Sequence, residues 1–137
     1  MIPSGPTTLD AVANAAFYYG AVMAMIHIPT APELLLQFDK ARDNFYRAAQ
    51  LGLRAQLHWL DDKMHPAADL LLKVLLPMAY EGLDLLGVAS SDSNEYLGII
   101  RQRLETGTNG AGWQRAFVSK HGRDMQALTA AYFQHQN

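Results

Sequence analysis

The sequence predicts a mainly α-helical fold, with about six helices in a compact bundle and one short extended or hairpin segment near residues 53–65. Half of the 137 residues are hydrophobic and only 18% are charged, a composition that supplies a packed core. Prolines and glycines divide the chain into apolar stretches of helical length. A chain of this size corresponds to one domain, so we expect residues 1–137 to form a single helical domain.

The first helix is expected to start at Thr7 or Thr8 and to run to about Ile26. Either threonine can cap it, and Asp10 places a carboxylate in the first turn, where the helix dipole favours negative charge. An irregular lead-in precedes the helix, at Pro3, Gly5 and Pro6. A stripe of small residues lets a neighbouring element pack very close, at Ala13, Ala16, Gly20 and Ala24.

Residues 11–28 form an 18-residue apolar run, which raises the question of a membrane span. Asn14 and His27 interrupt the run with polar groups, and no Lys or Arg lies within ten residues of either end. The start of the chain lacks the positively charged region of a signal peptide. We therefore expect a buried core helix, no membrane partner and a cytoplasmic protein, which the absence of cysteine also fits.

A second helix is expected from Pro32 to Gly52, since glycine commonly ends helices. Its apolar residues recur at spacings of four and three and form one face, at Leu34, Phe38, Ala41, Phe45 and Ala48. From Leu53 to Trp59 apolar and polar residues alternate, which is typical of a half-buried strand. A turn at residues 61–63 then completes the predicted hairpin segment.

The third helix, expected at residues 66–87, is apolar almost all round and should therefore be central. Pro77 removes a backbone donor from its middle, so we expect a kink there. A fourth helix is expected at residues 92–105, and Gly107 ends it. Its N-terminal cap is expected to be Ser91, Asp92 or Ser93.

A fifth helix is expected from about Asn109 to Lys120, with Trp113 fixing it to the core. Gly122 separates this helix from a sixth, which has Met125 and Leu128 on one side.

The charge distribution and the motifs exclude several function classes. A net charge of −2 gives the whole chain no electrostatic footprint for nucleic acid, although residues 101–124 hold five basic residues against two acidic ones. No two histidines have the spacing of ligands on one helix face, and no nucleophile elbow or phosphate-binding lysine loop occurs. A cluster at His58, Asp61, Asp62 and His65 is better explained as a solvated turn than as a metal site. We therefore expect no nucleic-acid partner, no catalytic residue and no metal ligand in this chain.

Two polar clusters remain as candidate binding residues. The second helix places Asn44 and Arg47 close together, one turn apart. The glycine-rich stretch from Gly107 to Gly112 exposes backbone N–H groups before a helix, and with Arg115 these can hold a phosphate or carboxylate. The simpler alternative for this stretch is a flexible helix joint with a solvated basic face.

Four segments resemble, in this order, the C-terminal part of carboxylate–amine ligases of the glutamate–cysteine ligase family 2, which are similar to γ-glutamylcysteine synthetases. The segments are GPTTLDAVANAAF, ARDNFYRAAQLGL, LLLKVLLPMAYEGLDLLGV and GTNGAGWQRAFVSKHGRDMQALTAAYF, which together span nearly the whole chain. The most specific parts are GPT before the first helix and the pattern from Asp43 to Ala48. The chain departs from the family at Asp43 and Tyr46, where Glu and Trp are typical, and at Gln50, where Arg is common.

The resemblance implies a parent enzyme that uses ATP and Mg²⁺ to activate a carboxylate as an acyl phosphate, which an amine then attacks. In that family, the sheet that binds the metal and ATP precedes the GPT motif, so the implied catalytic sheet lies N-terminal to residue 1. We therefore expect this chain to be a fragment of a larger α+β ligase, without a cofactor of its own and inactive alone. Its implied partner is the N-terminal catalytic region of the same protein.

If the chain contacts substrate or nucleotide, we expect Asn44, Arg47 and Arg115 to do so at the edge of the site. The arginines would pair with a carboxylate or phosphate, and Asn44 would orient one. The alternative function is a free-standing helical interaction module without enzyme activity. Such a module would form a homodimer, because a small bundle leaves apolar surface uncovered.

Overall fold

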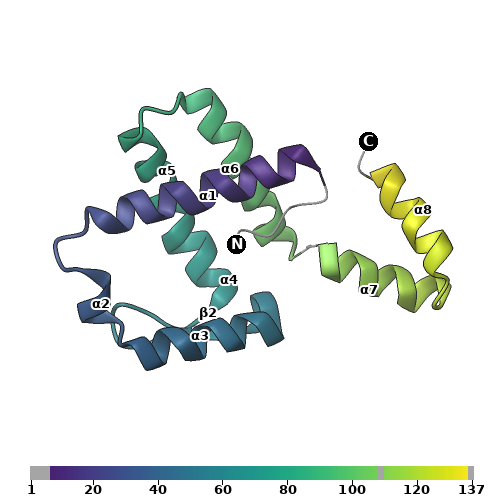
Figure 1. Ribbon diagram of the computed structural model, residues 1–137, viewed down its shortest axis with the longest axis horizontal. Helices are drawn as coiled ribbons and strands as arrows, with labels where there is room; N and C mark the ends of the chain where they lie inside the picture. Colours follow the sequence, from purple (N-terminus) through teal and green to yellow (C-terminus); the bar gives the residue numbers. More distant parts are fainter. Residues whose placement is uncertain (1–6, 108–109, 136–137) are drawn as a thin grey trace.

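The computed structural model describes residues 7–107 and 110–135, and helices make up most of this part of the chain (Figure 1). The predicted mainly α-helical fold with one short hairpin is confirmed. The lead-in expected at Pro3, Gly5 and Pro6, and the helix start expected at Asn109, lie outside the described residues.

Helix α1 (Thr8–Ile26) begins at the capping signal that the sequence contains. The Thr7 side-chain oxygen accepts a hydrogen bond from the Asp10 backbone N–H at 3.0 Å. In return, the Asp10 carboxylate accepts from the Thr7 backbone N–H at 3.2 Å. These reciprocal bonds satisfy two N–H groups that the first turn leaves without helical partners, so the predicted start is confirmed.

Helix α1 packs against α5 (Leu76–Leu85) through backbone rather than through large side chains. A Cβ atom added at Gly82 would overlap the carbonyl of Gly20, and one added at Gly20 would overlap the carbonyl of Ala79. Ala13 and Ala24 on the same stripe are buried. The close approach expected from the small-residue stripe is therefore present, and α5 is the element that makes it.

The helix expected from Pro32 to Gly52 is two helices, α2 (Pro32–Leu35) and α3 (Phe38–Leu51). Leu36 and Gln37 are extended between them, with ψ angles of 107° and 148°. The apolar spacing of four and three continues across this break, so periodicity alone cannot reveal it. The apolar face that this spacing predicts is largely exposed, and Phe38 on it is 81% exposed.

The short hairpin consists of β1 (Gln56–His58) and β2 (Met64–Pro66), paired antiparallel with Leu57 opposite His65. A 3₁₀ turn, η1 (Gly52–Arg54), precedes it, so the strand begins later than the alternating pattern suggests. Asp62 has a φ of 62° in the connecting turn, a left-handed conformation that aspartate tolerates. The predicted turn at residues 61–63 is therefore confirmed.

The long third helix is interrupted close to Pro77. It consists of α4 (Ala67–Leu70), a π-helical turn η2 (Leu71–Leu75) and α5. The N–H of Leu76 bonds to the carbonyl of Leu71, five residues back. Pro77 has no N–H to donate, and its ring would crowd the carbonyl of the preceding turn, so the wider turn accommodates it.

Helix α6 (Ser90–Thr106) ends at Gly107, whose φ is 63°. The cap expected at Ser91, Asp92 or Ser93 is wrong: Ala89 occupies the cap position, two to four residues earlier, and makes no side-chain cap bond. Ser93 is instead a buried residue of the helix, because its side of the first turn faces the molecule. Ser93 is therefore part of the packed interior, although its residue type favours a helix cap.

Helices α7 (Gly110–His121) and α8 (Met125–His135) follow α6 and lie to one side of the other helices (Figure 1). Gly122 separates them with a φ of 77°, and the Asp124 carboxylate accepts from the Ala127 N–H at 2.9 Å. The Trp113 ring packs on Phe117 and Tyr132, with centroids 5.6 and 5.8 Å away. Trp113 therefore joins α7 to α8 and is not among the residues packed against the core, contrary to the prediction.

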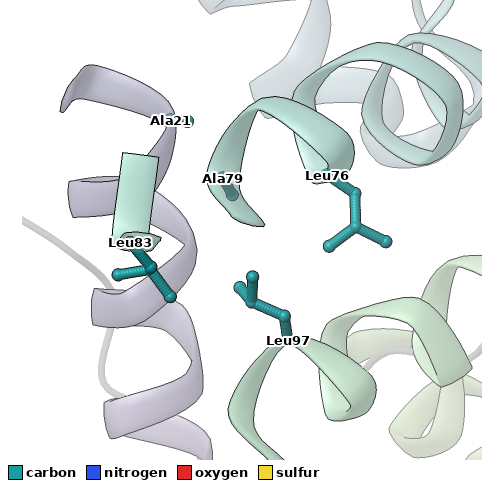
Figure 2. Packing of buried hydrophobic residues seen from close by; sticks show 5 residues of the cluster. All are labelled: Ala21, Leu76, Ala79, Leu83 and Leu97. Atoms are coloured by element: carbon teal, nitrogen blue, oxygen red, sulfur yellow. The ribbon is translucent and has the colours of Figure 1, made fainter. Parts of the chain in front are cut away.

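The core lies where α1, α5 and α6 meet. Figure 2 shows its central cluster, in which Leu76 and Leu83 of α5 and Leu97 of α6 point toward one another beside α1. Ala21 and Ala79 complete this cluster, which leaves little room between α1 and α5. α5 is therefore central, as its apolar sequence predicts.

Candidate functional site

Asn44 of α3 holds the hairpin against that helix. Its side-chain N–H donates to the His58 carbonyl at 2.8 Å, and its side-chain oxygen accepts from the His58 N–H at 2.7 Å. Both bonds are partly buried, and both go to the backbone of the last residue of β1. The described contacts of Asn44 therefore support the fold, and its expected role in orienting a substrate stays a prediction.

Arg47 lies one helical turn after Asp43 on the same face of α3. Its Nε donates to an Asp43 carboxylate oxygen at 2.6 Å. The Nε2 atom of His58 lies 3.6 Å from that same oxygen. Asp43 thus lies between Arg47 and His58. The Arg47 guanidinium is already paired with Asp43, so a ligand would have to compete with this carboxylate.

The histidines and aspartates of the hairpin turn separate into different pairs. His65 Nε2 lies 2.9 Å from an Asp61 oxygen, and this hydrogen bond holds the pKa of Asp61 below its ordinary value. Asp62 pairs with Lys40 of α3, whose hydrogen bond and positive charge lower the pKa of Asp62. Over the described residues no group of three His, Asp or Glu side chains can hold a metal ion.

Arg115 lines a cavity of about 270 Å³ that lies where the end of α3 and η1 meet the joint between α6 and α7. The other lining residues belong to two segments that are distant in sequence: Ala49, Gln50, Leu51, Gly52, Leu53 and Arg54 on one side, and Gly107 and Gly112 on the other. The glycine-rich stretch and the end of α3 are therefore brought together, as two walls of one cavity.

Arg54 is the residue that sequence reasoning missed. In the alternating pattern it looks like a solvent-facing strand residue, but the 3₁₀ turn at Gly52–Arg54 places it on the cavity wall with Arg115. Each of these arginines follows a glycine by two or three residues, at Gly52 and at Gly112. A glycine shortly before each arginine is the sequence signal that could have identified Arg54 together with Arg115. Arg54 and Arg115 both line the cavity, whereas Asn44 and Arg47 are not among its lining residues.

No protein-family model, no curated protein and no solved structure matches this chain. Among the helices of the described residues, α1 alone has the length and apolar composition to cross a membrane, a test that core helices and signal sequences also pass. In the structure, the small-residue side of α1 packs on α5.

Proposed function

We propose that this chain is the helical, non-catalytic portion of an ATP-dependent carboxylate–amine ligase of the glutamate–cysteine type. The order of the four resembling segments supports this proposal, and so does the helical fold that they form. In the intact enzyme the chain packs against the catalytic sheet in the cytoplasm. That N-terminal region supplies the ATP and Mg²⁺ sites.

The observation that supports this proposal best is the apolar surface of α2 and α3. Leu34, Phe38 and Phe45 are 76%, 81% and 71% exposed, and they lie on the stripe that has the period of a core face. Their exposed rings and side chains favour burial against another surface. A catalytic region of the same protein would cover these three side chains. It would explain why a stripe with the period of a buried face is largely exposed in the described residues.

Arg115 contributes to the substrate site of the intact enzyme in this proposal, as one wall of the cavity at the α6–α7 joint. It lies in a cavity and has no acidic partner among the described residues, so it is free to meet a carboxylate or phosphate. Arg47 is already bonded to Asp43, and Asn44 to His58, so their contributions are weaker than that of Arg115.

The test begins with the native protein, captured by antibody from its own cells and measured by intact mass spectrometry. The proposal expects a product several hundred residues long that releases ADP only when a carboxylate substrate such as glutamate and an amine are both present. Arg115→Ala should lower kcat/KM by about tenfold or more, since a lost hydrogen bond to a charged group costs about 1.5–3 kcal/mol. A native product of 137 residues without ADP release would contradict the proposal.

The second candidate function is a free-standing helical module that forms a homodimer through the same apolar face. Burial between two copies would also cover the exposed side chains of Leu34, Phe38 and Phe45. Dimerisation of the isolated chain fits both functions, because a separated fragment exposes the same face. A native 137-residue dimer without ligase activity would favour the module.

A further inference from the structure

The lining of the cavity at the α6–α7 joint carries positive charge without an acidic residue beside it. Its lining includes Arg54 and Arg115 but no aspartate or glutamate. Two other arginines are paired within the chain, Arg47 with Asp43 and Arg103 with Asp10. Neither Arg54 nor Arg115 has such a partner among residues 7–107 and 110–135. An anion between them would relieve the repulsion of two like charges on one cavity.

The cavity walls also leave backbone within reach of a ligand. Three of the nine lining residues are glycines, Gly52, Gly107 and Gly112. A Cβ atom added at Gly52 or at Gly107 would meet nothing within 4 Å, so the wall is open at these two residues. Gly52 and Gly107 have φ angles of 57° and 63°, a left-handed region that other residues enter at a cost. Gln50 adds a side-chain amide to the same wall. The lining therefore offers donors from two guanidinium groups and one amide.

The volume of the cavity restricts the ligand to a small one. At about 270 Å³ it lies below the range of roughly 300–1,000 Å³ that is usual for drug-sized ligands. The volume suits a phosphate, a diphosphate group or a short dicarboxylate. Guanidinium groups match all of these, because their parallel N–H groups bond two oxygens at once.

We propose that Arg54 and Arg115 together bind a compact oxyanion with two or more negative charges in the cavity between η1 and the α6–α7 joint. This inference adds a ligand class and a second arginine to the cavity that the proposed function assigns to Arg115. It can be tested separately from that function, because both walls belong to this chain. Arg54, which the sequence did not single out, is as important to this site as Arg115.

The test is calorimetric titration of the 137-residue chain, at low ionic strength, with inorganic phosphate, pyrophosphate and glutarate in separate runs and acetate as the singly charged baseline. We expect saturable binding of at least one doubly charged anion, and the strongest of the three identifies whether the site prefers phosphoryl or carboxylate groups. Arg54→Ala and Arg115→Ala should each weaken that binding by about tenfold or more, because each removes hydrogen bonds to a charged ligand.

Arg123→Ala is the matched control. Arg123 belongs to the same basic stretch and is exposed, but it does not line the cavity. Its removal should change the affinity by less than about twofold, because exposed charges outside a site are screened by solvent and salt. Arg115→Lys keeps the charge and loses the planar fork, so it should weaken binding less than Arg115→Ala does.

The location of binding is checked by amide NMR shifts of the chain during the titration. We expect the largest shifts near Gly52 and Gly107, on opposite walls of the cavity. Absence of saturable binding for all three anions would overturn the proposal. An equal loss of affinity in Arg123→Ala and Arg115→Ala would also overturn it, because it would indicate general attraction to a basic surface. Neither result concerns the native mass or the ADP release that test the ligase proposal.

Discussion

Two glycines, Gly20 of α1 and Gly82 of α5, let these helices meet backbone to backbone. At Gly82 a methyl group would overlap the Gly20 carbonyl, and the obstacle is main chain, which cannot rotate away. We expect Gly82→Ala to lower the free energy of unfolding by at least about 1–3 kcal/mol, as overpacking does in well-packed cores. The measurement is urea unfolding followed by circular dichroism.

Gly98→Ala provides the control for that substitution. Gly98 is also a helical glycine, in α6, but a methyl group added there meets nothing within 4 Å. Alanine should therefore stabilise α6 by about 0.5–1 kcal/mol, through its better helix propensity. If both variants were stabilised alike, the described contact between α1 and α5 would be wrong.

Asn44 is a second residue whose role can be separated by substitution. We expect Asn44→Ala to cost about 1–3 kcal/mol of stability, because it leaves the partly buried N–H and carbonyl of His58 without this partner. Asn94→Ala, at an exposed position of α6, should be neutral within about 0.5 kcal/mol. Thermal and urea unfolding of both variants distinguish them. Unchanged stability in Asn44→Ala would contradict the structural role, and a substrate contact would then be the better explanation for Asn44.

The aspartates of the hairpin turn predict how stability changes with pH. The pKa of Asp61 is lowered by its hydrogen bond with His65, and that of Asp62 by Lys40. A carboxylate with a lowered folded-state pKa stabilises the fold above its unfolded pKa, and the contribution is lost as the pH falls through the folded value. We therefore expect the hairpin to loosen below the ordinary aspartate pKa of 3.8.

This pH dependence is measured by urea unfolding at a series of pH values between about 7 and 2.5. Asp61→Asn combined with Asp62→Asn should flatten the acid part of the curve, because neither asparagine titrates. Asp84→Asn, at an exposed position of α5 without a described ion pair, is the control and should leave the slope nearly unchanged. Identical acid slopes in the wild type and the double variant would refute the assignment.

At the scale of elements, Asp10 links the start of α1 to α6. Its carboxylate closes the capping box with Thr7 and also pairs with Arg103. Because the Asp10 side chain is largely buried, Arg103→Ala should cost about 1–3 kcal/mol by leaving a charged acceptor without its partner. Lys73→Ala removes the exposed pair with Asp69 and should cost no more than about 1 kcal/mol. Equal costs in urea unfolding would mean that the link between α1 and α6 adds nothing.

The elements also show what sequence could predict and why. The start of α1 was predictable because Thr7 and Asp10 form a local signal within one turn. The ends of α6 and α7 were predictable because Gly107 and Gly122 adopt left-handed conformations that glycine favours. The break at Leu36 was not, because both flanking helices keep the same apolar spacing. The cap of α6 was not predictable either, because Ser93, whose residue type favours a cap, is buried within the helix.

Only one wall of the candidate site, the one with Arg115, was predictable from the sequence. Arg115 and its glycines form a pattern within a few residues, whereas Arg54 joins them only through the path of the chain from α3 to α7. Asn44 and Arg47 looked available in sequence because their partners, His58 and Asp43, are ordinary polar residues until the fold fixes their distances. Contacts between distant segments are therefore the part that the pattern of one sequence could not supply.

At the scale of the whole molecule, the apolar face of α2 and α3 predicts association. Phe38 and Phe45 are exposed enough that replacing both with serine should leave the fold stable. The double variant should sediment as a monomer at concentrations where the wild-type chain associates, because the rings supply the surface to be buried. Leu86→Ser, at another exposed apolar position, is the control and should associate as the wild type does. Unchanged association in the double variant would exclude this face.

The pairing of α1 with α5 also determines when the fold can form during synthesis. α1 emerges from the ribosome before α5, which follows about 50 residues later, and at roughly 5–20 residues per second this means a delay of several seconds. During this delay the apolar side of α1 has no α5 to cover it, and loop closure over that distance must precede the main core contacts. We therefore expect chaperones that bind short apolar segments to recognise the newly made chain until Gly82 packs against Gly20.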